Sequence, residues 1–425
     1  MKDQERLLVN SNGPLRGVVE ASGAKNAVLP ILAATILASE PVTLNNVPAL
    51  QDVFVLSKIL EDLGAKVSFS NNQLIVDPRD INKTRANHDL VSQMRASILV
   101  LGPILAKFGE AEVSLPGGCA IGSRPVDQHL LGMEALGAKI KIENGYVHAS
   151  VNGGRLKANH HAFDVVTVTG VENVLMAAVL ANGVTVLENC AKEPEVSDLA
   201  NMLVQLGAKI EGIGTDRLTI TGVEKLSGGE YTVMPDRIEI GTYMVAGAMT
   251  FGDITIESCI PEHVEAVTFA LRQAGCGVET TDSSIRIYPL ISRLKAIRIK
   301  TAPYPLFATD MQAQFMAMAA VSEGTSSIIE TIFENRFMHA NELVRMGANI
   351  KIDNRLALIE GVEKLSGATV TATDLRASAA LILAGLVAEG TTTIGALHHL
   401  DRGYDSIEAK LTNLGAKIER ITLAS

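Results

Sequence analysis

The feature that most constrains the fold of this chain is an internal repeat. The tetrapeptide Leu-Gly-Ala-Lys occurs four times, two weaker copies complete the series, and successive glycines lie 68 to 73 residues apart. The six glycines are Gly64, Gly137, Gly207, Gly275, Gly347 and Gly415. Each copy follows an amphipathic stretch, such as residues 53–63, and precedes a stretch of alternating polarity, such as residues 139–142. Because a left-handed glycine commonly ends a helix, each copy predicts a helix, a glycine stop and a strand.

A second pattern occurs earlier in each unit, where an apolar helix, a turn and an alternating strand follow one another. Residues 181–186, 251–256 and 389–394 show the turn and the strand. Repeats of solenoid proteins are usually about 20–50 residues long, so the longer unit of this chain resembles a small α/β subdomain. A chain of 425 residues also exceeds what one hydrophobic core normally supports. We therefore expect an α/β fold of two domains, each made of three repeated units.

Composition and charge exclude several classes of function. Hydrophobic residues make up 47% of the chain and tryptophan is absent, so we expect a globular protein with aliphatic cores. The longest apolar runs are shorter than the ~18 residues of a membrane span, and the first residues lack a signal-peptide pattern. The net charge of −10 argues against general nucleic-acid binding. We therefore expect neither a membrane nor a nucleic acid as a partner.

The cysteines indicate the compartment. They are widely spaced and form no metal-binding pair: Cys119, Cys190, Cys259 and Cys276. Free thiols are typical of a reducing environment, so we expect a cytoplasmic protein. The adjacent histidines His398 and His399 have no acidic residue placed to complete a metal site, and we expect no metal.

The first helix of each unit is apolar on every side, which is typical of a helix inside a core. These helices are predicted for residues 26–37, 96–107, 174–181, 311–321 and 377–388, and the sixth follows Asp236-Arg237. At their starts, Asp310 and Asp374 are explained as caps that complement the helix dipole. The positive charges of Lys25, Arg95 and Arg376 oppose that dipole. An anionic ligand above the helix starts would explain them, and we expect it between the two domains.

Residues 115–125 form a loop rich in glycine and proline that contains Cys119, with Arg124 five residues further on. Glycines let the backbone approach a ligand closely, and a nearby cation favours the thiolate. A surface turn that happens to contain a cysteine explains the same residues equally well, and the loop alone leaves both interpretations open. Arg402 lies in a second polar turn, where it either binds the same anion or pairs with a neighbouring aspartate.

Seven motifs in order make the chain similar to the enolpyruvyl transferase family along essentially its whole length. They are SGAKN (22–26), MRAS (94–97), PGGC (116–119) with RPVD (124–127), TDMQAQ (309–314), ENRF (334–337), DLRA (374–377) and DRGY (401–404). The resemblance implies that each domain is an inside-out α/β barrel with central helices. It assigns residues 22–233 to the first triplicated domain, which carries the Cys119 loop, and residues 1–21 plus 234–425 to the second. It also implies an active site in the cleft between them.

The resemblance implies a reaction as well. The enolpyruvyl group of phosphoenolpyruvate moves to the 3-hydroxyl of UDP-N-acetylglucosamine and phosphate is released, which is the first committed step of peptidoglycan synthesis in cell-wall biogenesis. In this addition–elimination, Cys119 corresponds to the general acid, which also forms a covalent adduct with phosphoenolpyruvate and is alkylated by the epoxide fosfomycin. Asp310 corresponds to the base at the sugar hydroxyl, with Lys25 and Arg402 as further catalytic residues. No cofactor is implied.

Binding positions follow from the same resemblance. Those for phosphoenolpyruvate are Lys25, Asn26, Arg124 and Arg402. Those for UDP-N-acetylglucosamine are Asn26, Arg95, Arg124, Pro125, Val126, Asp127, Gln128, Val165, Val168, Asp310 and Ile332. Residues that correspond to supports of the site are Asp374, Arg376 and Arg336.

One departure from the family pattern concerns the nucleotide. Some family members carry a lysine near it, whereas residues 164–168 read Asp-Val-Val-Thr-Val here and place Val165 in that stretch. A lysine contact with the diphosphate is therefore lost, although backbone contacts of residues 165–168 remain available. The variant sequence at residues 170–173 is expected to place Asn173 near the sugar instead.

The sequence has to be compared with two alternative functions. The shikimate-pathway enolpyruvyl transferase shares the architecture and the phosphoenolpyruvate chemistry, but it lacks the PGGC loop and the RPVD segment that follows it. A catalytically silent paralogue that binds only the nucleotide sugar would be expected to have lost Cys119, Asp310 or the arginines. All of these residues are present.

Overall fold

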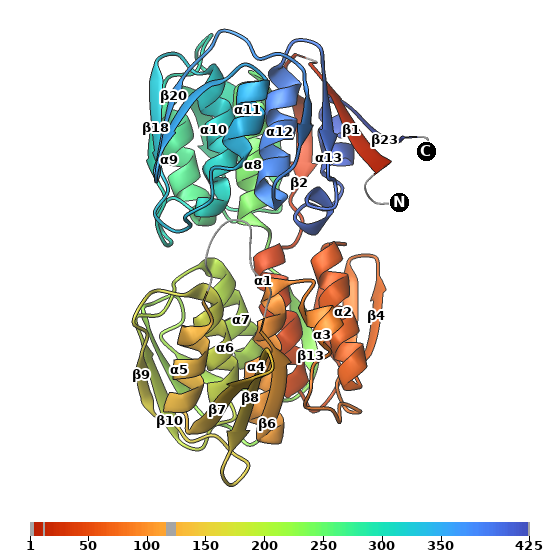
Figure 1. The fold of residues 1–425 in the computed structure, drawn as a ribbon, viewed down its shortest axis with the longest axis vertical. Coiled ribbons are helices and arrows are strands. Elements are labelled where there is room, and N and C mark those ends of the chain that lie inside the picture. Colours follow the sequence, from red (N-terminus) through yellow and green to blue (C-terminus); the bar gives the residue numbers. More distant parts are fainter. Residues whose placement is uncertain (1–3, 12, 116–124, 424–425) are drawn as a thin grey trace. The chain divides into compact units, whose positions relative to one another are not determined.

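The computed structural model describes residues 4–11, 13–115 and 125–423, which divide into two compact units. The first unit contains residues 23–115 and 125–234, and the second contains the described residues up to 22 together with residues 235–423. In Figure 1 the first unit runs from orange to yellow-green, whereas the second combines the red amino-terminal strands with the green to blue part of the chain. Each unit has a hydrophobic core of its own.

The first unit repeats one order of elements, which is inner helix, strand, outer helix and two strands. The first repeat contains α1 (Lys25–Ala34), β3 (Val42–Asn45), α2 (Gln51–Leu63), β4 (Lys66–Ser70) and β5 (Gln73–Asp77). The second contains η3 (Arg95–Val100) leading into α4 (Leu101–Phe108), then β6 (Glu110–Ser114), α5 (Asp127–Ala135), β7 (Ala138–Glu143) and β8 (Tyr146–Val151). The third contains α6 (Val168–Ala178), β10 (Val184–Glu188), α7 (Pro194–Gln205), β11 (Lys209–Glu211) and β12 (Arg217–Thr221). Shorter elements complete the unit: η2 (Thr35–Leu37), α3 (His88–Val91), β9 (His160–Ala162) and β13 (Gly229–Thr232).

The second unit repeats the same order. Its first repeat contains α8 (Arg237–Met249), β14 (Asp253–Glu257), α9 (Glu265–Gln273), β15 (Cys276–Thr280) and β16 (Ile285–Pro289). The next contains α10 (Gln312–Val321), β18 (Thr325–Ile329), α11 (His339–Arg345), β19 (Asn349–Asp353) and β20 (Leu356–Glu360). The last contains α12 (Leu375–Val387), β22 (Thr391–Gly395), α13 (Ile407–Asn413), β23 (Lys417–Thr422) and β1 (Glu5–Asn10). The remaining elements are β2 (Arg16–Glu20), β17 (Arg298–Lys300), β21 (Thr369–Thr371), η4 (Pro261–Val264), η5 (Thr309–Met311) and η6 (Leu400–Arg402).

Each repeat forms its own small sheet. Within the described residues, the orders are β13-β3-β5-β4, β6-β8-β7 and β11-β12-β10-β9 in the first unit, and β15-β16-β14-β2, β17-β18-β20-β19 and β21-β22-β1-β23 in the second. The four-stranded sheets are mixed, because one edge strand runs parallel to the strand that follows the inner helix. Strand β1 lies between β22 and β23, with Leu7 opposite Ile394 on one side and Arg420 on the other. The amino-terminal strand therefore completes the last repeat of the second unit.

The repeat glycines end the outer helices as predicted. Gly64, Gly137, Gly207, Gly275, Gly347 and Gly415 all have φ between 89° and 116°. This left-handed conformation costs little without a Cβ, and the backbone then turns into the following strand. The helix, glycine and strand order read from the sequence is confirmed in all six copies.

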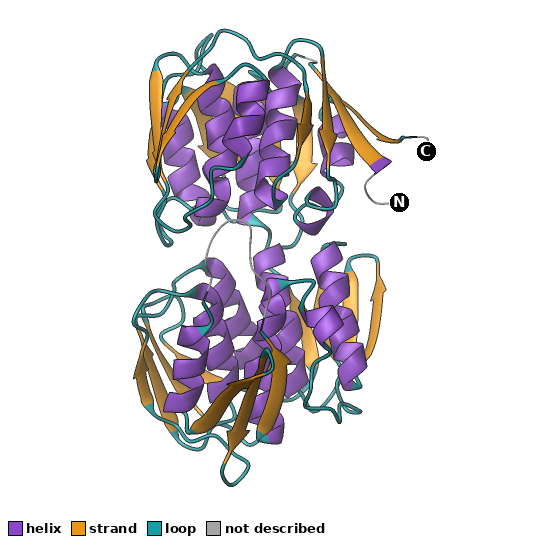
Figure 2. Cartoon of the chain, viewed as in Figure 1, coloured by secondary structure: helices purple, strands orange, loops and turns teal. Residues whose placement is uncertain are grey.

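The inner helices are enclosed. Every residue of α8 is buried, as is every residue of α10 except the last. The helices α8, α10 and α12 pack against one another, and Figure 2 shows the sheets along the outside of each unit with helices inside. The prediction of helices buried on every side is confirmed. One boundary differs, because α6 begins at Val168 rather than 174, where the Thr167 side chain accepts a hydrogen bond from the backbone N–H of Gly170.

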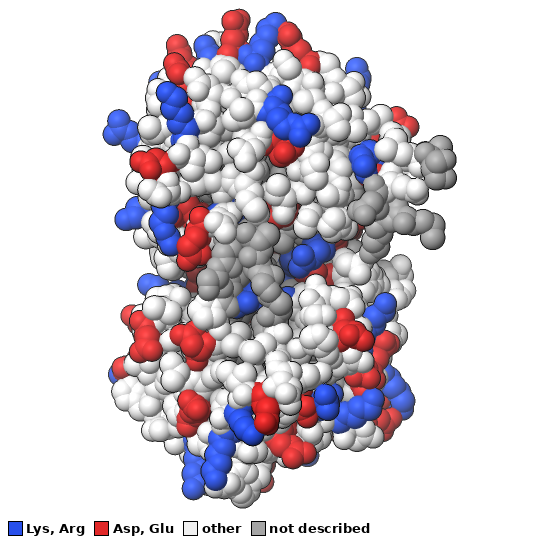
Figure 3. All heavy atoms as spheres, viewed as in Figure 1, with Lys and Arg blue, Asp and Glu red and all other residues white. Residues whose placement is uncertain are grey.

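On the face drawn in Figure 3, basic and acidic side chains are interspersed over each unit. Among the described residues, no helix is both long and apolar enough to cross a lipid bilayer.

The repeat glycines generate a stability prediction. A Cβ at Gly207 would meet nothing within 4 Å, whereas a Cβ at Gly64 would lie 2.6 Å from the backbone oxygen of Asp80. Gly207→Ala should therefore lower the free energy of unfolding by about 1 kcal/mol through left-handed strain alone. Gly64→Ala should lower it by about 2–3 kcal/mol, because overpacking adds to the strain. Urea unfolding of both variants checks this, and equal losses would contradict it.

Candidate active site

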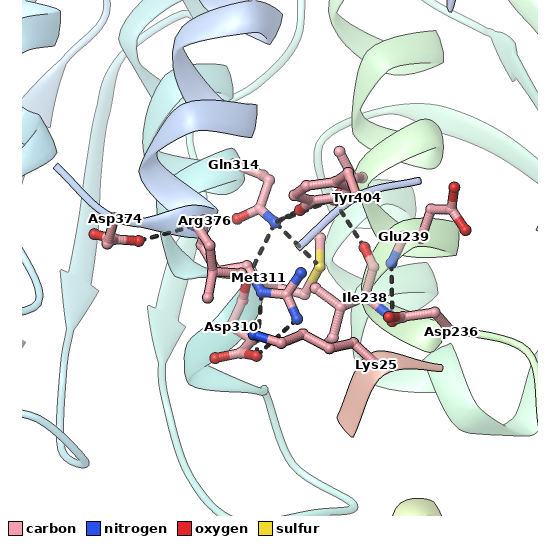
Figure 4. Close-up of polar contacts among 12 residues, drawn as sticks. Lys25, Asp236, Ile238, Glu239, Asp310, Met311, Gln314, Asp374, Arg376 and Tyr404 are labelled. Carbon is pink, nitrogen blue, oxygen red and sulfur yellow. Dashed lines mark hydrogen bonds and ion pairs between the residues drawn. The ribbon is translucent and has the colours of Figure 1, made fainter. Parts of the chain in front are cut away.

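Asp310 lies just ahead of the inner helix α10 and is held by two buried guanidinium groups. Arg336 donates from Nη2 to Oδ1 at 3.0 Å, and Arg376 donates from Nε and Nη2 to Oδ2 at 3.2 and 3.0 Å. Figure 4 shows the Arg376 side chain reaching down from α12 to this carboxylate. The side chains of Arg336 and Arg376 are 5% and 1% exposed, whereas that of Asp310 is 24% exposed. The two buried arginines therefore hold the carboxylate in place, and its exposed part is accessible to a ligand.

The two guanidinium groups set the charge of Asp310. Burial by itself raises the pKa of this carboxyl, but the positive charges of Arg376 and Arg336 outweigh burial and hold the pKa well below its usual range. Asp310 is therefore ionised at neutral pH. An ionised carboxylate only accepts hydrogen bonds, so this group can accept one from a hydroxyl.

The acidic residues at the starts of α10 and α12 have different roles. Asp374 is the cap of α12, since its side chain accepts hydrogen bonds from the backbone N–H groups of Arg376 and Ala377 at 2.8 and 3.0 Å. That prediction is confirmed. Asp310 is an acidic residue in the first turn of η5, as expected, but the N-cap position is Ala308 and the Asp310 carboxylate binds guanidinium groups. The anion beside Arg376 is Asp310 itself, so the charge of Arg376 needs no external ligand to explain it.

Glu330 fixes the loop that carries Ile332. This buried carboxylate accepts hydrogen bonds from the hydroxyls of Thr301 and Thr309 at 3.0 and 2.9 Å, and from the backbone N–H groups of Ile332 and Phe333 at 2.8 and 3.1 Å. It therefore joins the loop after β18 to the turn that contains Asp310. Sequence reasoning missed Glu330, although an acidic residue directly after an alternating strand was a visible signal.

Arg402 lies at the end of η6 and is half-buried. Its neighbour Asp401 is paired with Arg420 at 2.7 Å. The pKa of His399 is lowered by burial first and then by the charges of His398 and Arg402. Within the described residues, no group of three or more histidine, cysteine or acidic side chains could hold a metal ion.

In the first unit, Lys25 is the first residue of α1 and forms an ion pair with Asp52. The distance from Nζ to Oδ2 is 2.9 Å, and the two side chains are 7% and 3% exposed. Asn26 follows and is half-buried. The sequence attributed the charge of Lys25 to an external anion, but a buried carboxylate from α2 lies beside it. As at Arg376, a counter-charge within the same unit explains a cation at the start of an inner helix.

Several of the positions assigned to the nucleotide sugar lie together in the first unit. Arg95 at the start of η3 donates from Nη2 to the backbone oxygen of Pro125 at 3.5 Å. Gln128, buried in α5, donates to the Asp164 carboxylate at 3.2 Å and accepts from the Asp164 backbone N–H at 2.9 Å. These contacts join Arg95, the start of α5 and the segment 164–168. Within this group Pro125, Asp127 and Val165 are exposed, whereas Val126 and Val168 are half-buried.

Asn173 does not have the role predicted for it. It is fully buried, donates from Nδ2 to the backbone oxygen of Ile98 at 2.9 Å and to Nδ1 of His129 at 3.0 Å, and accepts from the backbone N–H of Gly102 at 2.7 Å. Both ends of the amide are therefore used within the unit, and the expectation of a sugar contact is wrong.

The hydrogen bond from Asn173 also fixes the tautomer of His129. Because Nδ1 of His129 accepts, Nε2 carries the proton and faces Thr169 Oγ1 at 3.2 Å. Burial first, and then the charge of Arg95, lower the pKa of His129 to about 4.

The remaining assigned residues are the proposed general acid and an anion ligand. Cys119 and Arg124 lie outside the described residues. The three described cysteines are buried, and burial raises the pKa of Cys190 to about 12, of Cys259 to about 11 and of Cys276 to about 12. Reactive cysteines need an accessible thiolate, so these three thiols are inert at neutral pH.

The assigned residues thus form a group within each unit. Asp310, Ile332, Arg336, Asp374 and Arg376 lie together at the starts of α10 and α12. In the first unit, α1 packs against η3, which begins with Arg95 and is joined to the start of α5 by the Arg95–Pro125 hydrogen bond. Each group combines ionic side chains with helix amino-terminal ends, an arrangement suited to anionic oxygen ligands.

Comparisons with known proteins agree with this chemistry. A family model described as EPSP synthase (3-phosphoshikimate 1-carboxyvinyltransferase) matches residues 9–411. A curated UDP-N-acetylglucosamine 1-carboxyvinyltransferase of Xylella fastidiosa is 56% identical over 423 residues, 98% of this chain and 100% of that protein. The crystal structure of the enolpyruvyl transferase NikO from Streptomyces tendae matches with a TM-score of 0.87 and 26% identity over 99% of both chains. An EPSP synthase from Acinetobacter baumannii matches with a TM-score of 0.75 and 18% identity over 98% of this chain and 100% of that one, which indicates a shared fold.

The internal role of Asn173 can be tested. Asn173→Ala leaves the buried Gly102 N–H and Ile98 carbonyl without their partner, so we expect the free energy of unfolding to fall by about 2–3 kcal/mol. Affinity for UDP-N-acetylglucosamine, measured by calorimetry on the folded variant, should be nearly unchanged. Asn26→Ala is the matched control and should weaken binding with little loss of stability. Weaker binding by Asn173→Ala at unchanged stability would contradict this account and show that Asn173 contacts the sugar.

Proposed function

The chain belongs to the EPSP synthase family of enolpyruvyl transferases, and we propose that it transfers the enolpyruvyl group of phosphoenolpyruvate to the 3-hydroxyl of UDP-N-acetylglucosamine with release of phosphate. The observation that carries the proposal is 56% identity, over its whole length, to a UDP-N-acetylglucosamine 1-carboxyvinyltransferase. On this assignment the chain is a transferase of peptidoglycan synthesis in the cytoplasm. The EPSP synthase structure at 18% identity shares the fold and gives no support to shikimate 3-phosphate as the acceptor.

The reaction is an addition followed by an elimination. In the addition, the methylene carbon of phosphoenolpyruvate gains a proton while the sugar hydroxyl oxygen bonds to the adjacent carbon and gives up its own proton. In the elimination, phosphate leaves with the electron pair of its C–O bond and the new methyl group loses a proton, which restores the double bond. The reaction therefore needs a proton donor, an acceptor beside the hydroxyl and cations for the phosphate and carboxylate.

The residues proposed for the phosphoenolpyruvate end carry the acid and the cations. Cys119 is the proposed proton donor, and it also captures phosphoenolpyruvate covalently. Lys25, Asn26, Arg124 and Arg402 are proposed to bind the phosphate and carboxylate, since three of them are cations and the amide can donate hydrogen bonds. The same cysteine is the proposed target of fosfomycin, because the thiolate attacks the epoxide carbon and opens the ring.

Asp310 is proposed to act on the sugar hydroxyl. Its carboxylate is ionised and held by two guanidinium groups, which makes it a weak base. We therefore assign to it the orientation of the hydroxyl through a hydrogen bond, and stabilisation of the positive charge that develops on the attacking oxygen. Proton transfer to Asp310 becomes favourable only as the hydroxyl grows acidic during the attack.

The residues proposed to bind the nucleotide sugar are Asn26, Arg95, Arg124, residues 125–128, Val165, Val168, Asp310 and Ile332. The Gln128–Asp164 hydrogen bonds support this assignment because they hold the segment 164–168 beside the start of α5. Val165 is 58% exposed and carries no charge. Recognition there is assigned to the backbone of residues 165–168, and the diphosphate charge to Arg95 and Arg124.

The experiment that tests the function is a coupled phosphate-release assay with phosphoenolpyruvate and each of two acceptors. We expect release with UDP-N-acetylglucosamine and none with shikimate 3-phosphate. Release with shikimate 3-phosphate alone would identify the shikimate-pathway enzyme. Binding of the nucleotide sugar without release with either acceptor would identify a silent paralogue, and both outcomes would contradict the proposal.

The same assay tests the role of Cys119. Cys119→Ser should lower kcat by about a hundredfold or more, because a hydroxyl is a far weaker acid than a thiol. It should also abolish the mass increase that fosfomycin causes in the unsubstituted chain. Cys190→Ala is the matched control, since this buried thiol should contribute nothing to labelling. A Cys119→Ser variant that is labelled normally would place the reactive thiol elsewhere.

A further inference from the structure

A buried polar cluster lies behind the Asp310–Arg376 pair, and the roles proposed above make no use of it. It consists of Thr242 on α8, Gln314 on α10 and Tyr404 directly after η6, and we call it the Tyr404 cluster. Thr242, Gln314 and Tyr404 are 1%, 0% and 4% exposed, respectively. They lie among helices that are otherwise apolar, where buried polar groups are costly unless they are hydrogen-bonded.

In the Tyr404 cluster, the donor and the acceptor of each hydrogen bond can be assigned. Thr242 Oγ1 donates its only hydrogen to the backbone oxygen of Ile238 at 2.8 Å. The Tyr404 hydroxyl, 3.0 Å away, must therefore donate to Thr242 Oγ1. Gln314 Nε2 lies 3.1 Å from Thr242 Oγ1 and 3.2 Å from the Tyr404 hydroxyl, and these two oxygens share one of its two hydrogens. The cluster thus joins two inner helices and the chain after η6 in a single arrangement.

The same cluster contacts both members of the Asp310–Arg376 pair. Gln314 Nε2 donates to the backbone oxygen of Asp310 at 3.1 Å, which also fixes the orientation of the amide. The Arg376 guanidinium carbon lies 5.4 Å from the centre of the Tyr404 ring, within the range of a cation–π contact. Figure 4 shows Gln314 and Tyr404 linked above Arg376, with Asp310 below it. A shift of Tyr404 would therefore move the Asp310 carboxylate in two ways, through Gln314 and the Asp310 backbone and through the Arg376 guanidinium.

We propose that Tyr404 is a positioning residue for the transfer reaction, holding Arg376 and the Asp310 backbone so that the Asp310 carboxylate meets the acceptor hydroxyl in the right orientation. The inference rests on the proposed function, because it assumes that Asp310 orients the attacking hydroxyl. The hydroxyl of Tyr404 makes its contacts inside the unit and is not assigned to substrate. Its loss should therefore lower kcat and leave substrate binding nearly unchanged, since small misplacements of reacting groups cost rate.

Two isosteric substitutions test the proposal. Tyr404→Phe removes the hydroxyl and keeps the ring, and Thr242→Val removes its acceptor and keeps the shape. Each should lower kcat by about tenfold, as expected for loss of one aligned hydrogen bond, with the KM values for both substrates nearly unchanged. Thr242→Ser retains the hydroxyl and should retain kcat. In the double variant Tyr404→Phe/Thr242→Val, the losses should not add, because both changes break one network.

Stability measurements distinguish a positioning role of Tyr404 from a general loss of stability of the second unit. The double variant removes both partners of the Tyr404–Thr242 hydrogen bond and leaves Gln314 with the backbone oxygen of Asp310 as an acceptor. It should therefore lose less stability in urea than the two single variants together, while its kcat stays low. Tyr243→Phe is the matched control, because Tyr243 is fully buried in the same unit and its hydroxyl donates to Glu239 at 2.9 Å. This control should lose stability with kcat nearly unchanged.

Normal kcat in Tyr404→Phe, with an active unsubstituted chain, would overturn the positioning role and leave the proposed function intact. A kcat loss in Tyr243→Phe equal to that in Tyr404→Phe would overturn it too, because activity would then follow general stability. Absence of phosphate release by the unsubstituted chain would overturn the proposed function and this inference with it.

Discussion

Both units depend on one constraint: helices that are apolar on every side have to be enclosed, which leaves their first turns as the places where ionic groups can lie. An ion in such a position is stable only beside a counter-charge, since desolvation of an isolated charge is expensive. The Lys25–Asp52 pair in the first unit and the Arg336–Asp310–Arg376 cluster in the second meet this requirement. The fold therefore creates paired ions at the helix starts, and these are the residues assigned to the reaction.

In the proposed reaction, Asp310 links this constraint to catalysis. Two guanidinium groups stabilise its ionised form, and the same contacts fix the orientation of the carboxylate. A carboxylate of this kind is preorganised to stabilise positive charge on an attacking oxygen, and this requires no rearrangement during the reaction. The Tyr404 cluster extends the arrangement inward, so that the orientation of one carboxylate depends on contacts from α8, α10 and α12 together.

The sequence predicted much of the fold because the relevant signals are local. A glycine stop at the end of each outer helix, an apolar inner helix and an alternating strand are all visible within about twenty residues. Each was found in its expected repeat, although α6 begins at Val168 rather than at residue 174. The partners of the charges could not be predicted in this way. Asp52 and Arg336 are brought to Lys25 and Asp310 by packing, and spacing along the chain gives no measure of that. Asn173 was misassigned for a related reason: two of its partners are the backbone groups of Ile98 and Gly102, which no side-chain pattern reveals.

The central claim is that Asp310 is held ionised by Arg336 and Arg376. The most direct test is a carbon-13 NMR titration of the aspartate side-chain carboxyls in the full chain, with the Asp310 signal assigned by its loss in Asp310→Asn. An unperturbed aspartate titrates near pH 4. The two guanidinium groups lower the pKa of Asp310, so its signal should remain at the ionised position from pH 7 down through the range in which unperturbed aspartates change. A midpoint at or above pH 4 would show that the guanidinium groups do not control this carboxylate and would contradict the account.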